Sequence, residues 1–126
     1  MAECDASYYC RICGEYVEDI TESEIYLRFV LGEVAPERLF DEAEAHLACA
    51  TELSQYIVDP GFPPVAEVRP EFDKRRLDPA QVAAREDKFT RAWRRLQRIP
   101  GSGWKLADYL LEDAIPTWLP GKSAQA

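Results

Sequence analysis

Two pairs of metal-ligand residues constrain this chain more than any other feature of its sequence. Two residues separate Cys10 from Cys13, and further along the chain His46 and Cys49 repeat the same spacing. Three thiolates and one imidazole provide four donors, the number that a closed tetrahedral zinc site takes. We therefore predict that these four residues hold one structural zinc ion and that Cys4 remains a spare thiol.

Each pair has a local geometry suited to this task. In CRICGE the chain must reverse so that both sulfurs face one ion, and Gly14 supplies the permissive backbone just after Cys13. In HLAC the three-residue separation places His46 and Cys49 on one side of a helical turn. The two pairs are thus predicted to approach each other as a tight turn and a helical turn.

Other interpretations of the cysteines explain less of the sequence. A thioredoxin-like Cys-x-x-Cys motif opens a helix after a strand, whereas here Gly14 follows the second cysteine and the second pair has no role. A disulfide framework suits an oxidising compartment, whereas we expect this chain in the reducing cytoplasm. An iron–sulfur cluster takes four cysteines, which would require Cys4 at an unusual spacing from Cys10. Scattered thiols beside a core histidine would leave unexplained why the only histidine lies three positions before a cysteine.

The segments YYCRICGE, IYLRFVLGEV and AEAHLACATEL together resemble a treble-clef zinc finger over residues 8–58. The ligand order is similar to that in the first half of LIM domains and in poly(ADP-ribose) polymerase-type fingers. The resemblance implies a knuckle, a β-hairpin and a helix that carries the last two ligands. No second LIM-type ligand set follows, and the segment is more acidic than fingers that grip DNA. HNH nucleases share the treble clef, but they need a catalytic histidine besides the zinc ligands.

The segment between the two ligand pairs supports two interpretations. Ile25, Leu27, Phe29 and Leu31 alternate with other residues, which predicts a half-buried strand, and we favour it. A Thr-x-x-Glu capping box followed by Gly32 would instead predict a helix here. We expect a return strand within residues 38–40 or 43–46. A helix over residues 47–58 should follow, with Leu53, Tyr56 and Ile57 facing inward.

The second half of the chain predicts helices. Residues 59–77 form a proline-punctuated connector, and Asp78-Pro79 is a strong helix start. We predict a helix to Arg98, and a second one from Ser102 that stops at Pro116, packed as a helical hairpin on the zinc module. The predicted apolar stripe of the first helix contains Val82, Phe89, Trp93 and Leu96. The fold class is therefore α+β, with a treble-clef zinc module (1–58), the connector (59–77) and a C-terminal helical hairpin with a tail (78–126).

Charge is unevenly distributed along this chain of net charge −8. Residues 1–68 contain 3 basic and 15 acidic side chains, whereas residues 69–98 contain 10 basic and 5 acidic ones. The basic residues of the long helix are Arg85, Lys88, Arg91, Arg94, Arg95 and Arg98. They are either a surface for phosphates or an acidic partner, or a face that is solvated and paired within the molecule.

These observations favour a binding protein over an enzyme. Four protein ligands close the zinc site, and with His46 on the metal no histidine remains for general acid–base or nucleophilic catalysis. We expect a cytoplasmic, zinc-stabilised interaction module whose partner is another protein: an adaptor, a regulator, or a phage-type inhibitor of a host nucleic-acid-binding machine. The contact would be made by the acidic module or by the aromatic tail around Trp118. The alternative is a nucleic-acid-binding zinc finger that uses the basic helix 78–98.

The expected cellular setting rests on two further observations. The N-terminal residues are acidic and lack the apolar region of a signal peptide, and no stretch approaches the roughly 18 apolar residues of a membrane span. The preference for arginine over lysine, with many alanines and prolines, indicates a bacterial or phage genome rich in GC.

Overall fold

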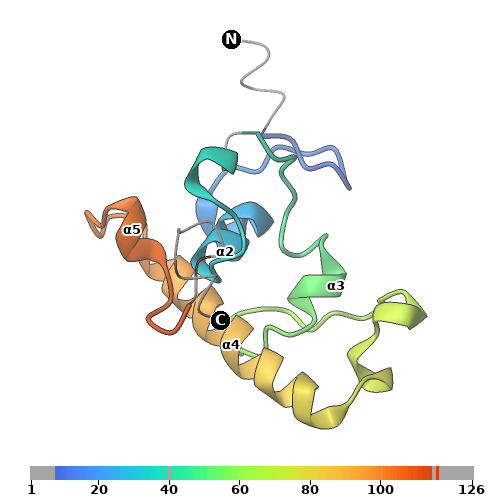
Figure 1. Cartoon of the computed structure of the whole chain (residues 1–126). Helices are drawn as coiled ribbons and strands as arrows, with labels where there is room; N and C mark the ends of the chain where they lie inside the picture. The colour runs from blue at the N-terminus through green and yellow to red at the C-terminus, as the bar shows by residue number, and fades with distance from the viewer. Residues whose placement is uncertain (1–7, 40, 115, 117–126) are drawn as a thin grey trace.

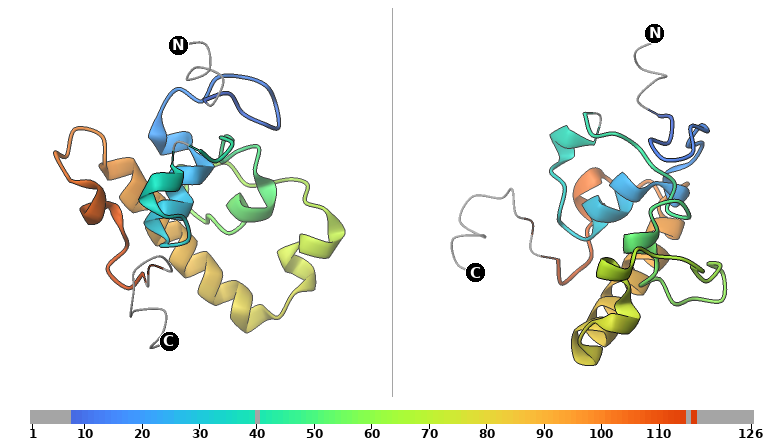
Figure 2. Two further views of the ribbon diagram at one scale, coloured as in Figure 1. Left: turned by 45° about the horizontal axis from the view of Figure 1, so that its top comes forward. Right: turned by 90° about the vertical axis from the view of Figure 1, so that its right-hand side faces the viewer.

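The computed structural model describes residues 8–39, 41–114 and 116, and the fold in this part of the chain is helical with long coil segments (Figure 1). In chain order the elements are the 3-10 helix η1 (Ile20–Glu22), α2 (Glu24–Val30), η2 (Pro36–Arg38), α3 (Thr51–Ser54), η3 (Pro70–Phe72), η4 (Lys74–Arg76), α4 (Pro79–Arg98) and α5 (Leu106–Tyr109). Helix α4 is the longest of them, and α2, η1 and η4 contact it (Figures 1 and 2).

Helix α4 forms where the sequence predicted it. Asp78 is the N-cap, and its carboxylate accepts a hydrogen bond from the amide of Gln81, while Pro79 occupies the first helical position. The helix ends at Arg98, and Gly101 adopts a φ of +77° in the turn beyond it. The boundaries were predictable because cap, proline and glycine act locally.

Helix α4 buries one face in the main core. Ala92 and Leu96 are fully buried, and Phe89 and Trp93 pack at the edge of the same cluster. The predicted stripe is therefore confirmed at three of its four positions, whereas Val82 lies outside the cluster. The other members of the core are Leu27, Val30, Leu31, Leu47, Ile57, Ile99 and Leu111.

The strand predicted over residues 25–31 is wrong, because this segment is the helix α2. Ser23 caps it by accepting a hydrogen bond from the amide of Tyr26 at 3.2 Å. Leu27 and Val30 enter the main core, whereas Ile25 and Phe29 enter a second cluster with Val34 and Leu39. A helix buried on two sides has apolar residues around most of its circumference, which here imitates the alternation of a strand.

The predicted α+β class and treble-clef arrangement are wrong for the same reason. Residues 8–39, 41–114 and 116 contain no strand, only two isolated antiparallel bridges, Tyr9 with Tyr16 and Ser23 with His46. The return strand expected over 43–46 is reduced to that second bridge, and Arg38 of the other candidate segment lies in η2. Phe40 lies outside the described residues. With α2 in place of the first strand, no partner exists for a hairpin.

The helix expected over residues 47–58 is limited to the single turn of α3. The side-chain amide of Gln55 donates to the carbonyls of Glu52 and Phe72, so it links the end of this turn to η3. Beyond it, the amide of Val58 donates to Thr90 Oγ1 on α4 at 2.8 Å. The backbone after α3 is therefore not helical and instead makes a hydrogen bond with α4. Tyr56 and Ile57 are buried and Leu53 is partly buried, as predicted.

The predicted helical hairpin is also wrong in its second half. Residues 102–114 form only the one-turn helix α5, with Gly103 at a φ of +77° before it. The chain then becomes extended at Leu110, and the amide of Leu111 donates to the carbonyl of Val30 at 2.9 Å. This hydrogen bond satisfies the carbonyl of Val30 at the end of α2. A longer α5 would lose it. The division into 1–58, 59–77 and 78–126 stays a prediction.

The structure also bears on the membrane prediction. Within the part of the chain that it describes, no helix is long and apolar enough to span a bilayer.

Candidate metal centre

The first ligand pair sits on a tight turn at the start of the described chain. The amide of Cys10 donates to the carbonyl of Glu15 at 2.8 Å, and the amide of Gly14 donates back to the carbonyl of Cys10 at 2.9 Å. Gly14 has a φ of +82°, a conformation that residues with a Cβ rarely adopt. The predicted reversal is therefore present, and its glycine is required by backbone geometry. We call residues 8–17 the metal turn.

The second pair sits on a single turn of helix-like backbone. The amides of Cys49 and Ala50 both donate to the carbonyl of His46 at 3.0 Å, so the ligands at positions 46 and 49 lie on one side, as predicted. This turn is tied to the first one because the amide of His46 donates to Cys10 Sγ at 3.4 Å.

The four predicted ligands converge on one point. One ligand atom from each of Cys10, Cys13, His46 and Cys49 lies within 4.8 Å of the other three. His46 Nδ1 is 3.3 Å from Cys13 Sγ and 3.8 Å from Cys49 Sγ. Zinc bond lengths of about 2.3 Å to sulfur and about 2.0–2.1 Å to nitrogen place tetrahedral ligands about 3.5–3.8 Å apart. The four residues are thus positioned to hold a metal ion.

A backbone carbonyl orients the histidine ligand. His46 Nε2 lies 3.0 Å from the carbonyl oxygen of Tyr16, so this nitrogen carries the hydrogen and donates it. The lone pair of Nδ1 is then directed at the sulfurs of Cys13 and Cys49. Metal-binding histidines usually donate their second nitrogen in this way, which fixes the tautomer and the ring plane. Sequence reasoning identified His46 but not the nitrogen that it uses.

The thiols differ in how readily they ionise. Cys10 is buried, which opposes ionisation, yet hydrogen bonds from the amides of Cys13, His46 and Ile12 lower its pKa to about 6. Burial and the neighbouring sulfurs of Cys13 and Cys10 raise the pKa of Cys49 to about 12. A bound cation supplies the positive charge that a cluster of three thiolates requires. Such a thiolate-rich donor set suits zinc and other soft or borderline metals.

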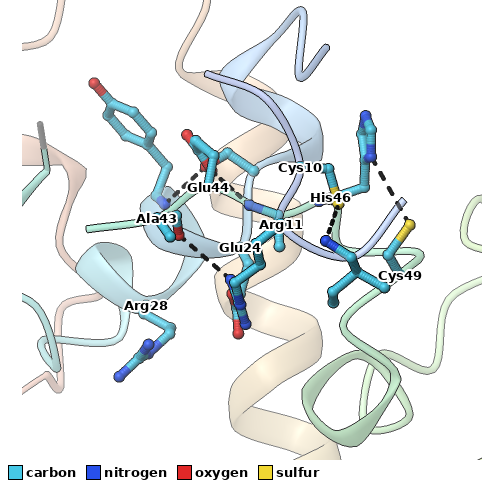
Figure 3. A network of polar contacts seen from close by, with 12 residues as sticks. Cys10, Arg11, Glu24, Arg28, Ala43, Glu44, His46 and Cys49 are labelled. Carbon is cyan, nitrogen blue, oxygen red and sulfur yellow. Dashed lines mark hydrogen bonds and ion pairs between the residues drawn. The ribbon is translucent and has the colours of Figure 1, made fainter. Parts of the chain in front are cut away.

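An ion-pair network that the sequence did not reveal anchors the metal turn to α2 (Figure 3). Arg11, between the two cysteine ligands, donates to Glu24 at 2.7 Å and to the carbonyl of Ala43 at 3.3 Å. Behind it, Ser23 donates to the buried carboxylate of Glu44, whose pKa is raised by burial. In Figure 3, Arg11 and Glu24 lie between the Ala43–Glu44 segment and the ligands. The signal in the sequence was only an arginine inside the Cys-x2-Cys motif.

The metal turn also presents an exposed aromatic surface that sequence reasoning missed. Tyr8, Tyr9, Ile12 and Tyr16 are 37%, 47%, 53% and 43% exposed. The ring of Tyr16 packs edge to face against Tyr9 with centroids 5.4 Å apart, and against Tyr8 at 6.3 Å. We call these four residues the tyrosine patch.

The basic residues of α4 are mostly engaged with the protein itself. Arg91 pairs with Asp87 and Asp113, each at 3.0 Å, and Arg94 pairs with Asp59 at 2.6 Å. Arg95 donates to the carbonyls of Asp108 and Tyr109 and lies over the Trp104 ring. Arg85 lies over the Tyr56 ring and donates to its hydroxyl. Among the described residues, no ion pair involves Lys88 or Arg98. The structure therefore does not assemble the six cations into one open stripe.

Two other predicted features, Cys4 and Trp118, lie outside the described residues. Comparisons with models of known protein families, with curated proteins and with solved structures found no match to this chain. The function of the protein is therefore inferred from the geometry of its site.

Proposed function

We propose that this protein is a zinc-stabilised interaction module without enzymatic activity, and that its metal turn docks on the basic surface of another protein. Cys10, Cys13, His46 and Cys49 would supply all four ligands of the ion. A zinc ion closed by four protein ligands has no position for substrate or water, and its contribution is to folding. A cytoplasmic setting accords with the reduced thiols that such a site needs.

The tyrosine patch is the observation that carries the proposal. Aromatic side chains are enriched at protein interfaces because they bury a large area at low entropic cost, and monomeric proteins rarely expose several of them together. The patch is part of the same turn as Cys10 and Cys13, so the metal ion would hold its rings in place. A preorganised surface binds with a smaller entropic cost.

Charge supports a basic protein surface as the partner. Glu15, Glu18 and Asp19 are exposed beside the patch, and the first 68 residues carry 15 acidic against 3 basic side chains. A basic protein surface is complementary to such a face and would be attracted to it over about a Debye length. An adaptor, a regulator or a phage-type inhibitor that imitates the phosphates of a nucleic acid would share this chemistry.

Binding of nucleic acid through residues 78–98 is the weaker candidate. Four of the six basic side chains on α4 already contact carboxylates, carbonyls or rings of the same chain. Releasing them would offset the gain from phosphate contacts.

Co-purification from the native host tests the proposal when it is quantified against matched variants. The double variant Tyr9→Ser with Tyr16→Ser should reduce the amount of captured partner at least tenfold. Its zinc content should stay at one ion per chain, because neither tyrosine is a metal ligand. Phe72→Ser with Leu77→Ser removes two other apolar side chains, 42% and 38% exposed, and should leave capture unchanged. Equal loss from both pairs would show that the patch is not the docking surface.

A further inference from the structure

The largest of the cavities described for this fold lies between the metal turn, α3 and α4. Its volume is about 740 Å³, within the range of about 300–1,000 Å³ typical of sites for small molecules. Ile12 lines it from the metal turn, Thr51 and Leu53 from α3, and Arg85 and Phe89 from α4. We call it the α3–α4 groove. The groove is distinct from the tyrosine patch. Of the four residues of the patch, only Ile12 lines the groove.

The groove concentrates positive charge in an acidic protein. Five of the chain's fifteen lysines and arginines line it, together with only three carboxylates. The five cations are Arg11, Arg28, Arg69, Arg85 and Lys88. In a molecule of net charge −8, such a gathering makes a local site where an anion is attracted rather than repelled.

The three carboxylates are each matched by one arginine. Arg11 pairs with Glu24 at 2.7 Å, Arg28 lies 3.7 Å from Glu33, and Arg69 pairs with Glu52. These pairs leave two cations of the groove, both on α4, with no carboxylate partner among the described residues.

Those two cations are Arg85 and Lys88, one helical turn apart. Arg85 lies over the ring of Tyr56, with its guanidinium carbon 5.5 Å from the ring centroid, and this contact holds the side chain against the groove. Its remaining donors are available to a ligand, because guanidinium has five N–H groups. Lys88 contributes a second charge from the next turn of α4. Two cations on successive turns of one helix match the charge of a doubly charged group.

Part of the groove lining is apolar. Leu53 and Phe89 are partly exposed there, Ile12 is 53% exposed at one wall, and Phe89 packs edge to face on Tyr56 with centroids 5.4 Å apart. A fully hydrated ion such as inorganic phosphate would leave these apolar side chains without a contact. A ligand with a flat apolar part beside its charge would cover both halves of the site.

We propose that the α3–α4 groove binds a phosphate monoester with an aromatic body, the chemistry of a mononucleotide. Arg85 and Lys88 bind the phosphate, as guanidinium and ammonium groups commonly do. Leu53 and Phe89 contact the ring of the ligand. Arg11, which lies between two metal ligands in the sequence, and the ligand Cys49 both line the groove, so the groove adjoins the metal site.

Titration of the full-length, metal-loaded protein with AMP at low ionic strength tests this assignment, followed by calorimetry and by backbone amide shifts. We expect saturable binding with shifts at Leu53, Arg85 and Phe89. Adenosine, which lacks the phosphate, and inorganic phosphate, which lacks the ring, should each bind at least about tenfold more weakly. Absence of saturation by AMP, or phosphate binding as tightly as AMP, would overturn the proposal.

Variants on α4 distinguish binding in the groove from non-specific attraction of anions to the protein. Arg85→Gln and Lys88→Gln should each weaken AMP about tenfold, the loss typical of one charged hydrogen bond. Arg98→Gln changes the net charge equally on the same helix outside the groove, and it should leave the affinity within twofold. Equal weakening by Arg98→Gln would refute a site at Arg85 and Lys88. Lys88→Gln removes no described ion pair, so its fold is retained, and circular dichroism verifies this.

Discussion

The backbone amide of His46 donates a hydrogen bond to Cys10 Sγ at 3.4 Å, so the two ligand pairs are in direct contact through the most buried ligand. The contact joins a turn at the start of the chain to one more than thirty positions later. It lets one ion stabilise the association of both segments. Binding of the ion and folding of these two segments should therefore be coupled.

Loss of a ligand should release the metal turn more than the helical core. We expect Cys13→Ser and Cys49→Ser to lose the ion, because a three-donor site binds zinc far more weakly, while Cys4→Ser retains one zinc per chain by elemental analysis. Hydrogen exchange should then rise in residues 8–18 and 43–50, with α2 and α4 still protected by their common core. One zinc per chain in Cys13→Ser, or its loss in Cys4→Ser, would contradict the ligand assignment.

The ligand nitrogen of His46 is predicted to be Nδ1. Because Nε2 donates to the Tyr16 carbonyl 3.0 Å away, the imidazole nitrogen shifts of this single histidine should show a protonated Nε2 and a metal-bound Nδ1. His46→Cys should keep four donors and retain the ion, with a stronger sulfur-to-metal charge-transfer band after cobalt substitution. His46→Ala should lose it. A protonated Nδ1 in the metal-loaded protein would show that the other nitrogen is the ligand.

The contact between α2 and α4 should dominate the free energy of unfolding apart from the metal. Leu27 and Leu96 are both fully buried in the main core, so each replacement by alanine should cost about 2–5 kcal/mol. The control is Leu106→Ala, where the side chain is 39% exposed and the expected cost is below about 1 kcal/mol. Denaturant unfolding of the zinc-loaded proteins measures all three. Similar costs at the three positions would argue against this core.

Asp73 should make stability depend on pH in the acidic range. Hydrogen bonds from the side chain and amide of Arg75 lower the pKa of Asp73 from 3.8 to about 2. A lowered pKa means that the stabilisation is complete above the unfolded value and disappears as pH falls from about 4 towards 2. The difference in unfolding free energy between wild type and Asp73→Asn should therefore shrink over that interval, when both proteins are compared at each pH. A constant difference would show that Asp73 remains unpaired.

The site could be predicted from sequence to a greater extent than the fold, for a physical reason. Metal ligands must satisfy a fixed geometry, so the spacings of Cys10–Cys13 and His46–Cys49 carry information that tertiary packing does not alter. The segment of α2 lacked such a constraint. Its alternating apolar residues suited a strand, and only the presence of two clusters, one on each side, explains why Ile25 and Leu27 are both buried in a helix.

The interaction surfaces were beyond sequence reasoning for a related reason. An exposed tyrosine and a buried one are alike in a sequence, so the patch formed by Tyr9 and Tyr16 appeared only once the turn was folded. Likewise, the arginines of α4 form a uniform series in the sequence. The fold separates them, because Arg91 and Arg94 meet acidic residues from distant segments while Arg85 faces a groove.

The basic helix is predicted to stabilise the fold rather than bind nucleic acid. Arg91 joins α4 to Asp113, and Arg95 donates to the carbonyls of Asp108 and Tyr109, so both hold the α5 segment. Replacing Arg91, Arg95 and Arg98 together by glutamine should lower the melting temperature and increase exchange in residues 105–114. The wild-type protein should show no nucleic-acid binding at about 150 mM salt, because the acidic half of the chain repels a polyanion. Micromolar binding of DNA or RNA at that salt concentration, abolished in the triple variant while its melting temperature is unchanged, would establish the opposite role for this helix.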